Sequence, residues 1–384
     1  MTCGHSDLST RKIPNMTSDF KSHPPRGAAV IVGMSGGVDS AVAAALLIQQ
    51  GYAVRGLFMK NWDEDDDTEY CTARVDLADA QGVCDLLGIE LLTANFAAEY
   101  WDDVFATFLD AYRNNLTPNP DVLCNREIKF RQFRDYAKTL GAQFIATGHY
   151  ARLRESAGVP VLCKGVDSGK DQSYFLQALS AEQLQNVLFP VGHLWKREVR
   201  EIAAQLGLPN KEKKDSTGIC FIGERRFSDF LARYLPRKPG RIADTEGRTR
   251  GQHTGLAYYT IGQRQGLGIG GQASGVEAPW YVTDKRVHDN TLLVSQHAED
   301  LTGDWLAAQN VNWIGSAPDL PMPCHAKIRY RQTDQEAQVS QRADGQLLVR
   351  FSIPQRAITP GQYVCFYRGE QVLGGATITC GGQS

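Results

Sequence analysis

The chain has 384 residues, more than a typical single domain, so two or three domains are expected. Its 41 basic and 43 acidic residues nearly balance, so net charge neither favours nor excludes a nucleic-acid partner. The sequence has no run of about 18 apolar residues, which excludes a membrane-spanning helix.

Residues 1–27 lack the apolar segment of a secretory signal, and we expect a flexible tail on a cytoplasmic protein. Met16 is a second candidate for the start of the chain. The nine cysteines are irregularly spaced and include no C-x-x-C pair, which excludes a zinc ribbon and a thioredoxin-type motif. Such thiols are typical of a reducing compartment.

The next part of the chain alternates apolar runs with helical patterns. Residues 28–32 are apolar and β-branched, a Gly/Ser turn covers 33–40, an Ala/Leu-rich helix follows to Gly51, and 53–60 predict a second strand. This order is typical of a βαβ unit with a parallel sheet. Further elements are predicted at 72–88 (helix), 89–96 (strand), 98–116 (helix), 126–141 (helix) and 142–150 (strand). The fold class is α/β with a doubly wound sheet, and ligands should lie beyond the carboxyl ends of its strands.

The turn after the first strand contains SGGVDS, residues 35–40. It is neither a Walker loop nor a G-x-G-x-x-G motif. Its glycines let backbone N–H groups close on a phosphate, and the helix from Val38 adds its positive end. The turn resembles the pyrophosphatase loop of the N-type ATP pyrophosphatases, which cleave ATP between the α and β phosphates. That resemblance implies ATP contacts from Gly33, Met34, Ser35, Gly36, Gly37, Val38, Asp39 and Ser40. Asp39 is the candidate ligand of Mg²⁺ on the pyrophosphate, since phosphate plus one or two carboxylates usually holds this ion.

Cys124 follows an Asn-Pro-Asp turn and precedes a helix for which Asn125 is a candidate N-cap. The helix N-terminus favours a thiolate. Free cysteines are more often small buried hydrophobes, so the residues alone leave both interpretations open. Asp121, three residues before the thiol, is suited either to proton transfer or to capping the turn.

Cys220 lies between Gly218 and Gly223 in a basic part of the chain. Residues 211–241 hold nine Lys or Arg against four Asp or Glu. Positive charge favours a thiolate at Cys220 and attracts phosphates. Alternatively, Cys220 is a core residue of a strand, and the basic residues form an ordinary solvated face. Residues 170–172, Lys-Asp-Gln, suit either nucleic-acid contact or an ordinary surface loop.

After about residue 222 the pattern changes to period-two alternation with Gly-rich turns. Residues 255–271 predict a strand, a turn and a glycine-rich loop, and 279–296 predict two strands around an Asp-Asn turn. We expect a tail at 1–27, a catalytic domain at 28–222, a central β-rich domain at 223–292 and a C-terminal β-barrel at 293–384. Arg329, Tyr330 and Arg331 are predicted on one strand, with both arginines on the same face.

Six motifs occur together in one order: GMSGGVDSA, NPDVLCNREIKF, GHYAR, KDQSYFL, STGICFIGERRF and GLAYYTIGQRQGLGIGG. This combination resembles the bacterial tRNA-specific 2-thiouridylases from about residue 28 to the end of the chain. Met34 and Ala41 are slight departures beside the loop. The resemblance implies a fold of the adenine nucleotide alpha hydrolase kind.

The resemblance also implies residue roles. Cys220 matches the cysteine that receives a persulfide, Cys124 the second catalytic cysteine, and Asp121 the acid/base carboxylate. Asn119, Pro120 and Asp121 match the segment that touches the target base. Met59 and Gly148 match nucleotide contacts, with Met59 at the adenine. Contacts to tRNA are implied for Lys170, Asp171, Gln172, Arg329, Tyr330 and Arg331.

The implied reaction uses ATP and Mg²⁺ to adenylate the C2 oxygen of the wobble uridine, after which persulfide sulfur replaces it. Either Cys124 releases hydrosulfide first, or the outer sulfur attacks C2 and Cys124 resolves the adduct. Both routes end in a transient Cys124–Cys220 disulfide. The implied partners are tRNAs for Lys, Glu and Gln and a sulfur donor, a relay protein or a cysteine desulfurase. We expect a monomer without a membrane partner.

Two other classes fit parts of the sequence. An ATP pyrophosphatase that makes amides from ammonia would use the glycine loop but neither cysteine. A non-catalytic RNA-binding protein on the same scaffold would need neither the loop nor the thiols.

Overall fold

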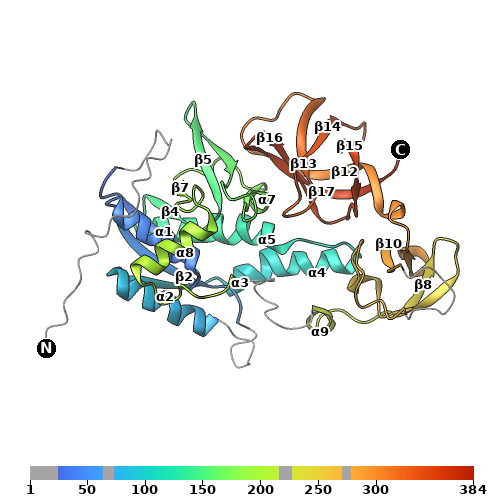
Figure 1. The fold of residues 1–384 in the computed structure, drawn as a ribbon, viewed down its shortest axis with the longest axis horizontal. Helices are drawn as coiled ribbons and strands as arrows, with labels where there is room; N and C mark the ends of the chain where they lie inside the picture. Colours follow the sequence, from blue (N-terminus) through green and yellow to red (C-terminus); the bar gives the residue numbers. More distant parts are fainter. Residues whose placement is uncertain (1–24, 64–72, 216–226, 270–277) are drawn as a thin grey trace. The chain divides into compact units, whose positions relative to one another are not determined.

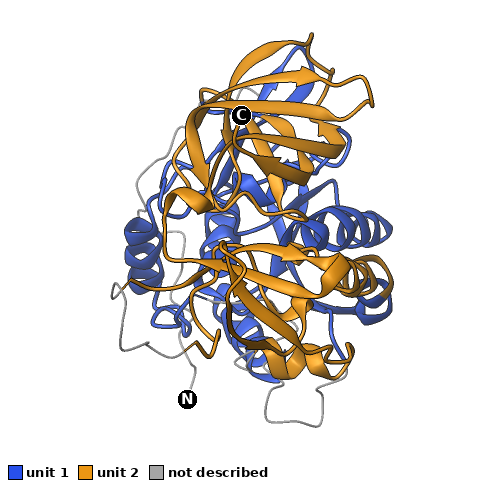
Figure 2. Ribbon diagram, turned by 90° about the vertical axis from the view of Figure 1, so that its right-hand side faces the viewer, with its two compact units in different colours: residues 1–101, 121–223, 370–372 blue, residues 102–120, 224–369, 373–384 orange. Residues whose placement is uncertain are grey.

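The computed structural model describes residues 25–63, 73–215, 227–269 and 278–384 (Figure 1). The chain divides into two compact units, coloured in Figure 2. Unit 1 comprises residues 1–101, 121–223 and 370–372, and unit 2 comprises 102–120, 224–369 and 373–384. Among the described residues, no helix is long and apolar enough to cross a membrane.

Unit 1 is built on a parallel sheet, as predicted. Its strand order is β3 (Leu91–Asn95), β2 (Ala53–Lys60), β1 (Ala29–Met34), β4 (Phe144–Ala146) and β7 (Val187–Leu188). Every neighbouring pair is parallel. The chain moves outward from β1 to β3 and then returns to the other side of β1, so the topological switch point lies between β1 and β4.

Helices cover both faces of this sheet, which confirms the doubly wound class. On one face, Val30, Val32 and Met34 of β1 share a core with three helices: α1 (Val38–Gln49), α2 (Ala73–Leu87) and α8 (Lys196–Leu206). Gly33 alternates to the opposite face, where a Cβ atom would lie 3.4 Å from the Phe133 ring of α6 (Phe133–Thr139). The glycine turn thus follows a strand that is buried on both sides.

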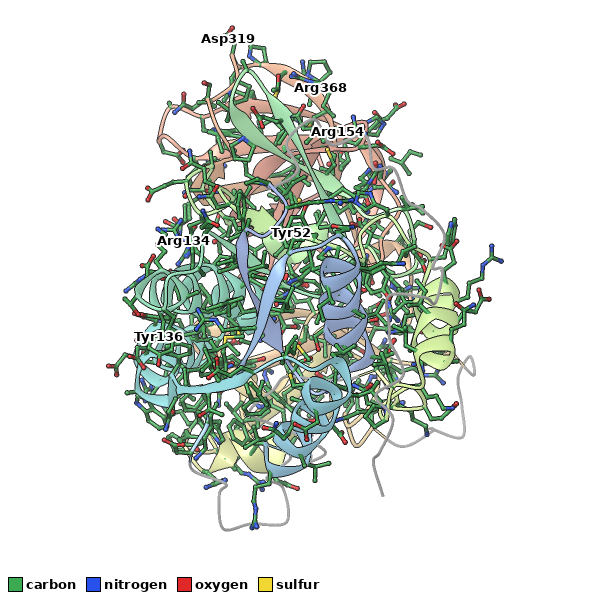
Figure 3. All side chains as sticks on the ribbon, turned by 90° about the vertical axis from the view of Figure 1, so that its left-hand side faces the viewer. Tyr52, Arg134, Tyr136, Arg154, Asp319 and Arg368 are labelled. Carbon is green, nitrogen blue, oxygen red and sulfur yellow. The ribbon has the colours of Figure 1, made fainter. Side chains whose placement is uncertain are left out.

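Smaller elements complete unit 1. They are α3 (Ala97–Tyr100), α5 (Pro120–Leu123), the π-helix η3 (Cys124–Gln132), α7 (Ser173–Leu176) and the hairpin of β5 (Ala151–Ser156) with β6 (Val159–Lys164). Arg152 of the hairpin pairs with Glu370 at 2.9 Å, and Arg154, labelled in Figure 3, pairs with the same carboxylate.

Two predicted helices differ from the observed ones. The helix expected at 98–116 is divided into α3, the π-turn η2 (Trp101–Phe105) and α4 (Ala106–Arg113). The helix expected from residue 126 begins at Pro120, because α5, η3 and α6 follow one another without a break. Asn125 therefore does not cap it; its side-chain amide donates to the Phe175 carbonyl at 3.3 Å.

Unit 2 contains α4, a four-stranded sheet and a barrel. Aromatic side chains of residues 105–112 pack against those around α9 (Phe227–Ala232), including Phe105 on Tyr234 with ring centroids 4.9 Å apart. The sheet order is β10 (Tyr281–Arg286), β11 (Thr291–Ser295), β8 (Gly240–Asp244) and β9 (Thr249–His253). The 3₁₀ turns are η4 (Leu256–Tyr258), η5 (Val287–Asp289) and η6 (Glu299–Leu301).

The C-terminal barrel confirms the predicted β-rich half of the chain. Its strands follow the order β12 (Thr302–Trp313), β15 (Leu347–Arg356), β14 (Gln335–Gln341), β13 (Met322–Lys327), β16 (Tyr363–Arg368) and β17 (Gln371–Gly382). Pairing of β12 with β17 closes it. The hairpin predicted at 279–296 is confirmed by β10 and β11. The strand predicted within 255–271 is wrong, since the described part forms η4 and turns.

Candidate active site

The glycine turn between β1 and α1 is held by short-range hydrogen bonds and by one distant contact, from Asn210 Nδ2 to the Gly36 carbonyl at 2.9 Å. Ser40 Oγ donates to the Gly37 carbonyl at 3.0 Å and accepts from the Ser35 N–H at 3.3 Å. Gly36 has a φ of +72°, and a Cβ atom there would lie 2.4 Å from the Asp76 carbonyl oxygen, so only glycine fits. No side chain caps α1 at Gly37, and the N–H groups at such a helix start are suited to bind an anion.

Two other predicted nucleotide contacts lie against this turn. A Cβ atom on Gly148 would lie 2.7 Å from the Asp39 carbonyl carbon and the Ser40 nitrogen, so residue 148 must be glycine for the segment after β4 to approach α1. The Met59 methyl group lies 3.3 Å from the corresponding Cβ position of Gly33. The structure therefore brings Met59 and Gly148 together with residues 33–40, at the carboxyl ends of β1, β2 and β4.

Asp39 lies in a charged network. Lys196 Nζ donates to Asp39 Oδ1 at 2.7 Å and to Oδ2 at 2.9 Å, and the Tyr150 hydroxyl donates to Oδ1 at 2.8 Å. Burial and the neighbouring Asp39 carboxylate raise the pKa of Tyr150, so this hydroxyl stays protonated and remains a donor.

The same lysine also contacts a second carboxylate, with Lys196 Nζ 2.7 Å from Asp215 Oδ1. Asp215 further accepts from Lys170 at 2.6 Å and Arg200 at 3.2 Å. Burial alone would raise the pKa of Asp215, but its hydrogen bonds to Lys170 and Lys196 outweigh burial and lower the pKa to about 2. Lys170, predicted to contact tRNA, is thus linked to the nucleotide turn through Asp215 and Lys196.

Asp39 is the carboxylate in the glycine turn that was predicted to bind Mg²⁺. Both Asp39 oxygens already accept hydrogen bonds, so a metal ion would share this carboxylate with Lys196. One carboxylate with phosphate oxygens and water is a sufficient ligand set for Mg²⁺. The residues therefore fit an ion that arrives with a nucleotide. Within the described ranges, no group of three His, Cys, Asp or Glu side chains is arranged to hold a metal.

Cys124 and Asp121 lie on the helical segment that starts at Pro120. Cys124 is only 4% exposed and is the first residue of η3. Asp121, in the first turn of α5, is half-buried. Burial raises the pKa of Asp121, and Lys129 opposes that shift. A carboxylate with a raised pKa is a stronger base than an ordinary aspartate, which suits it to proton transfer.

The neighbours of Lys170 serve the loop itself. Asp171 is buried, and its Oδ1 accepts the N–H groups of Gly165 at 3.0 Å and Ser173 at 3.1 Å. Gln172 Oε1 accepts the Tyr150 N–H at 3.0 Å. Of the two roles left open for Asp171 and Gln172, these contacts favour loop ordering.

His149, beside Gly148, has the environment of a structural histidine. Its Nδ1 lies 2.7 Å from the Thr147 hydroxyl, and its ring packs on Phe130 and Phe189. Burial lowers the pKa of His149 well below its usual value, so the ring is neutral.

The predicted strand through Arg329, Tyr330 and Arg331 is wrong. β13 ends at Lys327, and the three residues lie in a turn. Arg331 has a φ of 63°, which breaks the alternation that was expected to put both arginines on one face. The Gln332 side chain holds this turn by accepting the Ile328 N–H at 2.8 Å.

The structure does not place all of the predicted site residues together. Cys220, with the predicted Cys124–Cys220 disulfide, lies outside the described residues. Asn119, Pro120 and residues 329–331 belong to unit 2, whereas the nucleotide turn and Cys124 belong to unit 1. Lys196, Tyr150 and Asp215 were missed by the sequence analysis. Their partners are distant in the chain, with 157 positions separating Asp39 from Lys196, so no local pattern marks them.

Models of known protein families match successive parts of the chain. Three family models match in succession: tRNA methyl transferase HUP domain at residues 28–224, tRNA methyl transferase PRC-barrel domain at 228–296 and Aminomethyltransferase beta-barrel domain at 304–378. The chain therefore contains a HUP domain followed by two β-rich domains.

Curated relatives match nearly the whole chain. A protein of Pseudomonas paraeruginosa named tRNA-specific 2-thiouridylase MnmA is 60% identical over 357 residues, which cover 92% of this chain and 95% of the relative. Proteins of the same name from Marinomonas sp. and Methylococcus capsulatus are each 58% identical, over 91% of this chain and over 90% and 95% of their own lengths. The chain belongs to the tRNA-specific 2-thiouridylase family.

Proposed function

We propose that this chain is an ATP-dependent sulfurtransferase that converts the wobble uridine of tRNA to 2-thiouridine. The observation that carries the proposal is the identity of 58–60% over nearly the full length to relatives named for this reaction. The preorganised glycine turn, with an uncapped helix N-terminus beside it, supports ATP as the activating substrate.

In the first step, the C2 oxygen of the uridine attacks the α-phosphorus of ATP, and pyrophosphate leaves. The N–H groups at the start of α1 bind the pyrophosphate, and Lys196 balances the charge of Asp39. Asp39 would hold Mg²⁺, which supplies positive charge to the phosphates when bound. The AMP group makes the C2 oxygen a good leaving group.

In the second step, sulfur attacks C2 and AMP leaves with the oxygen. The sulfur comes from a persulfide on Cys220. Either Cys124 thiolate attacks the inner sulfur and frees hydrosulfide, which then attacks C2, or the outer sulfur attacks C2 and Cys124 then attacks the Cys220 sulfur. Each route oxidises the two thiols to one disulfide, which a dithiol reductant must reduce before a sulfur donor reloads Cys220. Asp121, with its raised pKa, accepts and returns the proton.

The remaining parts of the proposal concern partners. We propose tRNAs for Lys, Glu and Gln as substrates, a relay protein or cysteine desulfurase as the sulfur donor, and a cytoplasmic monomer as the working form. Lys170 and residues 329–331 are proposed tRNA contacts.

The test follows both products. The protein is incubated with ATP, Mg²⁺, a cysteine desulfurase with cysteine, and an unmodified tRNA-Glu transcript. We expect AMP, pyrophosphate and 2-thiouridine in equal amounts, the last detected by mass spectrometry of the digested RNA. A protein that consumes no ATP in the presence of tRNA would contradict the proposal. Amide formation from ammonia would instead favour an amide synthetase.

A further inference from the structure

Residues 115–118 connect α4 to the segment Asn119–Asp121 and belong to no helix or strand. Asn115 has a φ of 60°, and Thr117 is only 8% exposed. Such a connection is ordinarily the least constrained part of a helical region. Here its backbone is held by residues far away in the chain, all of them within unit 2.

The central domain holds the first half of the connection. Lys285 of β10 donates from Nζ to the Asn115 carbonyl at 3.0 Å across 170 residues of sequence. Thr117 Oγ1 donates to Thr260 Oγ1 at 3.4 Å. Lys285 is half-buried, and burial lowers its pKa to about 8. The hydrogen bond to the Asn115 carbonyl therefore forms at the cost of partly removing this amine from water.

The barrel holds the second half. The Thr117 N–H donates to the Pro360 carbonyl at 3.0 Å. Gln362 Nε2 donates to two successive carbonyls, Thr117 at 2.8 Å and Pro118 at 3.2 Å. A Cβ atom on Gly361 would lie 2.8 Å from the Thr117 nitrogen, so the two backbones meet without space between them.

Gln362 is itself fixed. Its carbonyl accepts the Ile378 N–H at 2.8 Å, and the Gly361 N–H donates to the Ile378 carbonyl at 2.9 Å. Its side chain therefore extends from a loop that is paired with β17 of the closed barrel. The Gln362 side chain donates to two consecutive carbonyls, and its own backbone is fixed by hydrogen bonds. Such a donor fixes both the position and the orientation of the peptide unit between the two carbonyls.

We propose that Gln362, with Lys285, is a positioning residue for the target-base segment. We name the contacts of Lys285, Pro360 and Gln362 with residues 115–118 the 115–118 clamp. The clamp fixes the positions of Asn119 and Pro120, which follow it directly in the chain. It thereby fixes how these residues are oriented toward the uridine that they are proposed to contact. The inference rests on the proposed function, because it assigns residues 119–121 to the base.

The test compares Gln362→Leu with Gln338→Leu. Leu keeps the approximate size of Gln but removes the donor, and Gln338 is an exposed glutamine on β14 of the same barrel. Two quantities are measured: the single-turnover rate of 2-thiouridine formation at saturating ATP and tRNA, and the equilibrium affinity for tRNA. For Gln362→Leu we expect a rate at least roughly tenfold lower and an affinity within about twofold of the parent. The control should change neither.

A local readout accompanies the kinetics. Hydrogen exchange of the peptide covering residues 106–123 should be faster in Gln362→Leu, because the Thr117 and Pro118 carbonyls lose their side-chain donor. The backbone around the Thr117 N–H, which donates to the Pro360 carbonyl, is then held by fewer contacts. A rate and an exchange profile like those of the parent would overturn the proposal. So would a rate that stays unchanged while exchange increases throughout the protein, since Gln362 would then act only on stability.

Two further outcomes need their own measurements: a Gln362→Leu variant that does not fold, and a parent protein that forms no 2-thiouridine. If Gln362→Leu does not fold, Lys285→Met removes the clamp contact from the other domain and must give the same pattern of low rate and unchanged affinity. If the unaltered protein forms no 2-thiouridine, the proposed function fails, and unchanged exchange at residues 106–123 would overturn the clamp independently.

Discussion

The glycine turn and the 115–118 connection are both proposed to present backbone to the substrate, but they are held in different ways. The turn is held mainly by hydrogen bonds between residues two to five positions apart, such as Gly37 to Ser35 and Ser35 to Ser40, with one distant contact from the Asn210 amide to the Gly36 carbonyl. The connection is held by side chains and carbonyls from other domains, up to 245 residues away. Local contacts therefore supply most of the hydrogen bonds of the turn, whereas distant residues supply those of the connection.

The proposed function gives a reason for this difference. Pyrophosphate is the same in every proposed turnover, so a fixed binding turn suits it. The proposed target base belongs to a large tRNA, and hydrogen bonds to the β-rich domains would fix the position of the segment that contacts this base. Substitutions in the turn should therefore act on ATP chemistry, whereas those in the clamp should act on the rate at the base.

The largest expected effect is at Gly36. Gly36→Ala places a methyl group where the Asp76 backbone stands, 2.4 Å away, at a φ of +72°. We expect at least roughly a 100-fold loss of tRNA-dependent AMP formation, measured with radiolabelled ATP. Gly88→Ala is the control, because Gly88 has a φ of +68° with nothing within 4 Å, and it should cost only about 1 kcal/mol of stability and no activity. Equal effects of the two substitutions would contradict the close fit of the turn.

Lys196→Met is expected to come next. It removes the cation shared by Asp39 and Asp215, whose side chains are each 30% exposed, and leaves two carboxylates facing each other. The free energy of unfolding should fall by about 2 kcal/mol and the KM for ATP should rise roughly tenfold. Urea titration and steady-state kinetics measure these. Lys138→Met, with a side chain 58% exposed, is the control, and a matching loss there would argue against a special role for Lys196.

A pH dependence follows from Lys285. Its pKa is lowered from 10.5 to about 8 by burial, so the unfolded chain binds more protons than the folded one between these values. The cost of burying the charged amine is fully present below pH 8 and is relieved as the pH rises toward 10.5. Relative to Lys285→Met, the parent should gain about 2 kcal/mol of stability across that window, measured by denaturation at several pH values. A constant difference would show that this amine is not desolvated.

The smallest effect is expected in acid. The pKa of Asp215 is lowered from 3.8 to about 2 in the folded protein by Lys170 and Lys196 despite burial. Its stabilising contribution is therefore complete above pH 4 and is lost as the pH falls toward 2. The stability gap between the parent and Asp215→Asn, about 1 kcal/mol after solvent screening, should close over this range. A gap that persists at pH 2 would mean that the carboxylate charge does not matter.

The same comparison explains what the sequence could predict. The order of β1, α1 and β2, the glycine turn and the β-rich half depend on local apolar periodicity and turn residues, and these predictions agree with the structure. The helix start at Pro120 was missed because Asn125 has the residue type of a cap, although its amide contacts the Phe175 carbonyl instead. The strand through residues 329–331 was wrong because the left-handed backbone of Arg331 ends the alternation without a glycine to mark it.

The network of Lys196, Tyr150 and Asp215 and the clamp of Lys285 and Gln362 left no local sequence signal. Each contact joins residues more than 100 positions apart or depends on a side chain that faces another element. A single sequence gives residue type and spacing, and neither specifies which distant amine will meet which carbonyl.

The most direct test of the account is to follow one sulfur atom. The protein is loaded with ³⁵S by a cysteine desulfurase and labelled cysteine, freed of small molecules, and mixed once with ATP, Mg²⁺ and tRNA-Glu transcript. In the proposed mechanism, label moves to the wobble uridine in one turnover and leaves a Cys124–Cys220 disulfide, Cys220→Ser takes up no transferable label, and Cys380→Ser behaves like the parent. Label reaching the uridine in Cys220→Ser as fast as in the parent would contradict it.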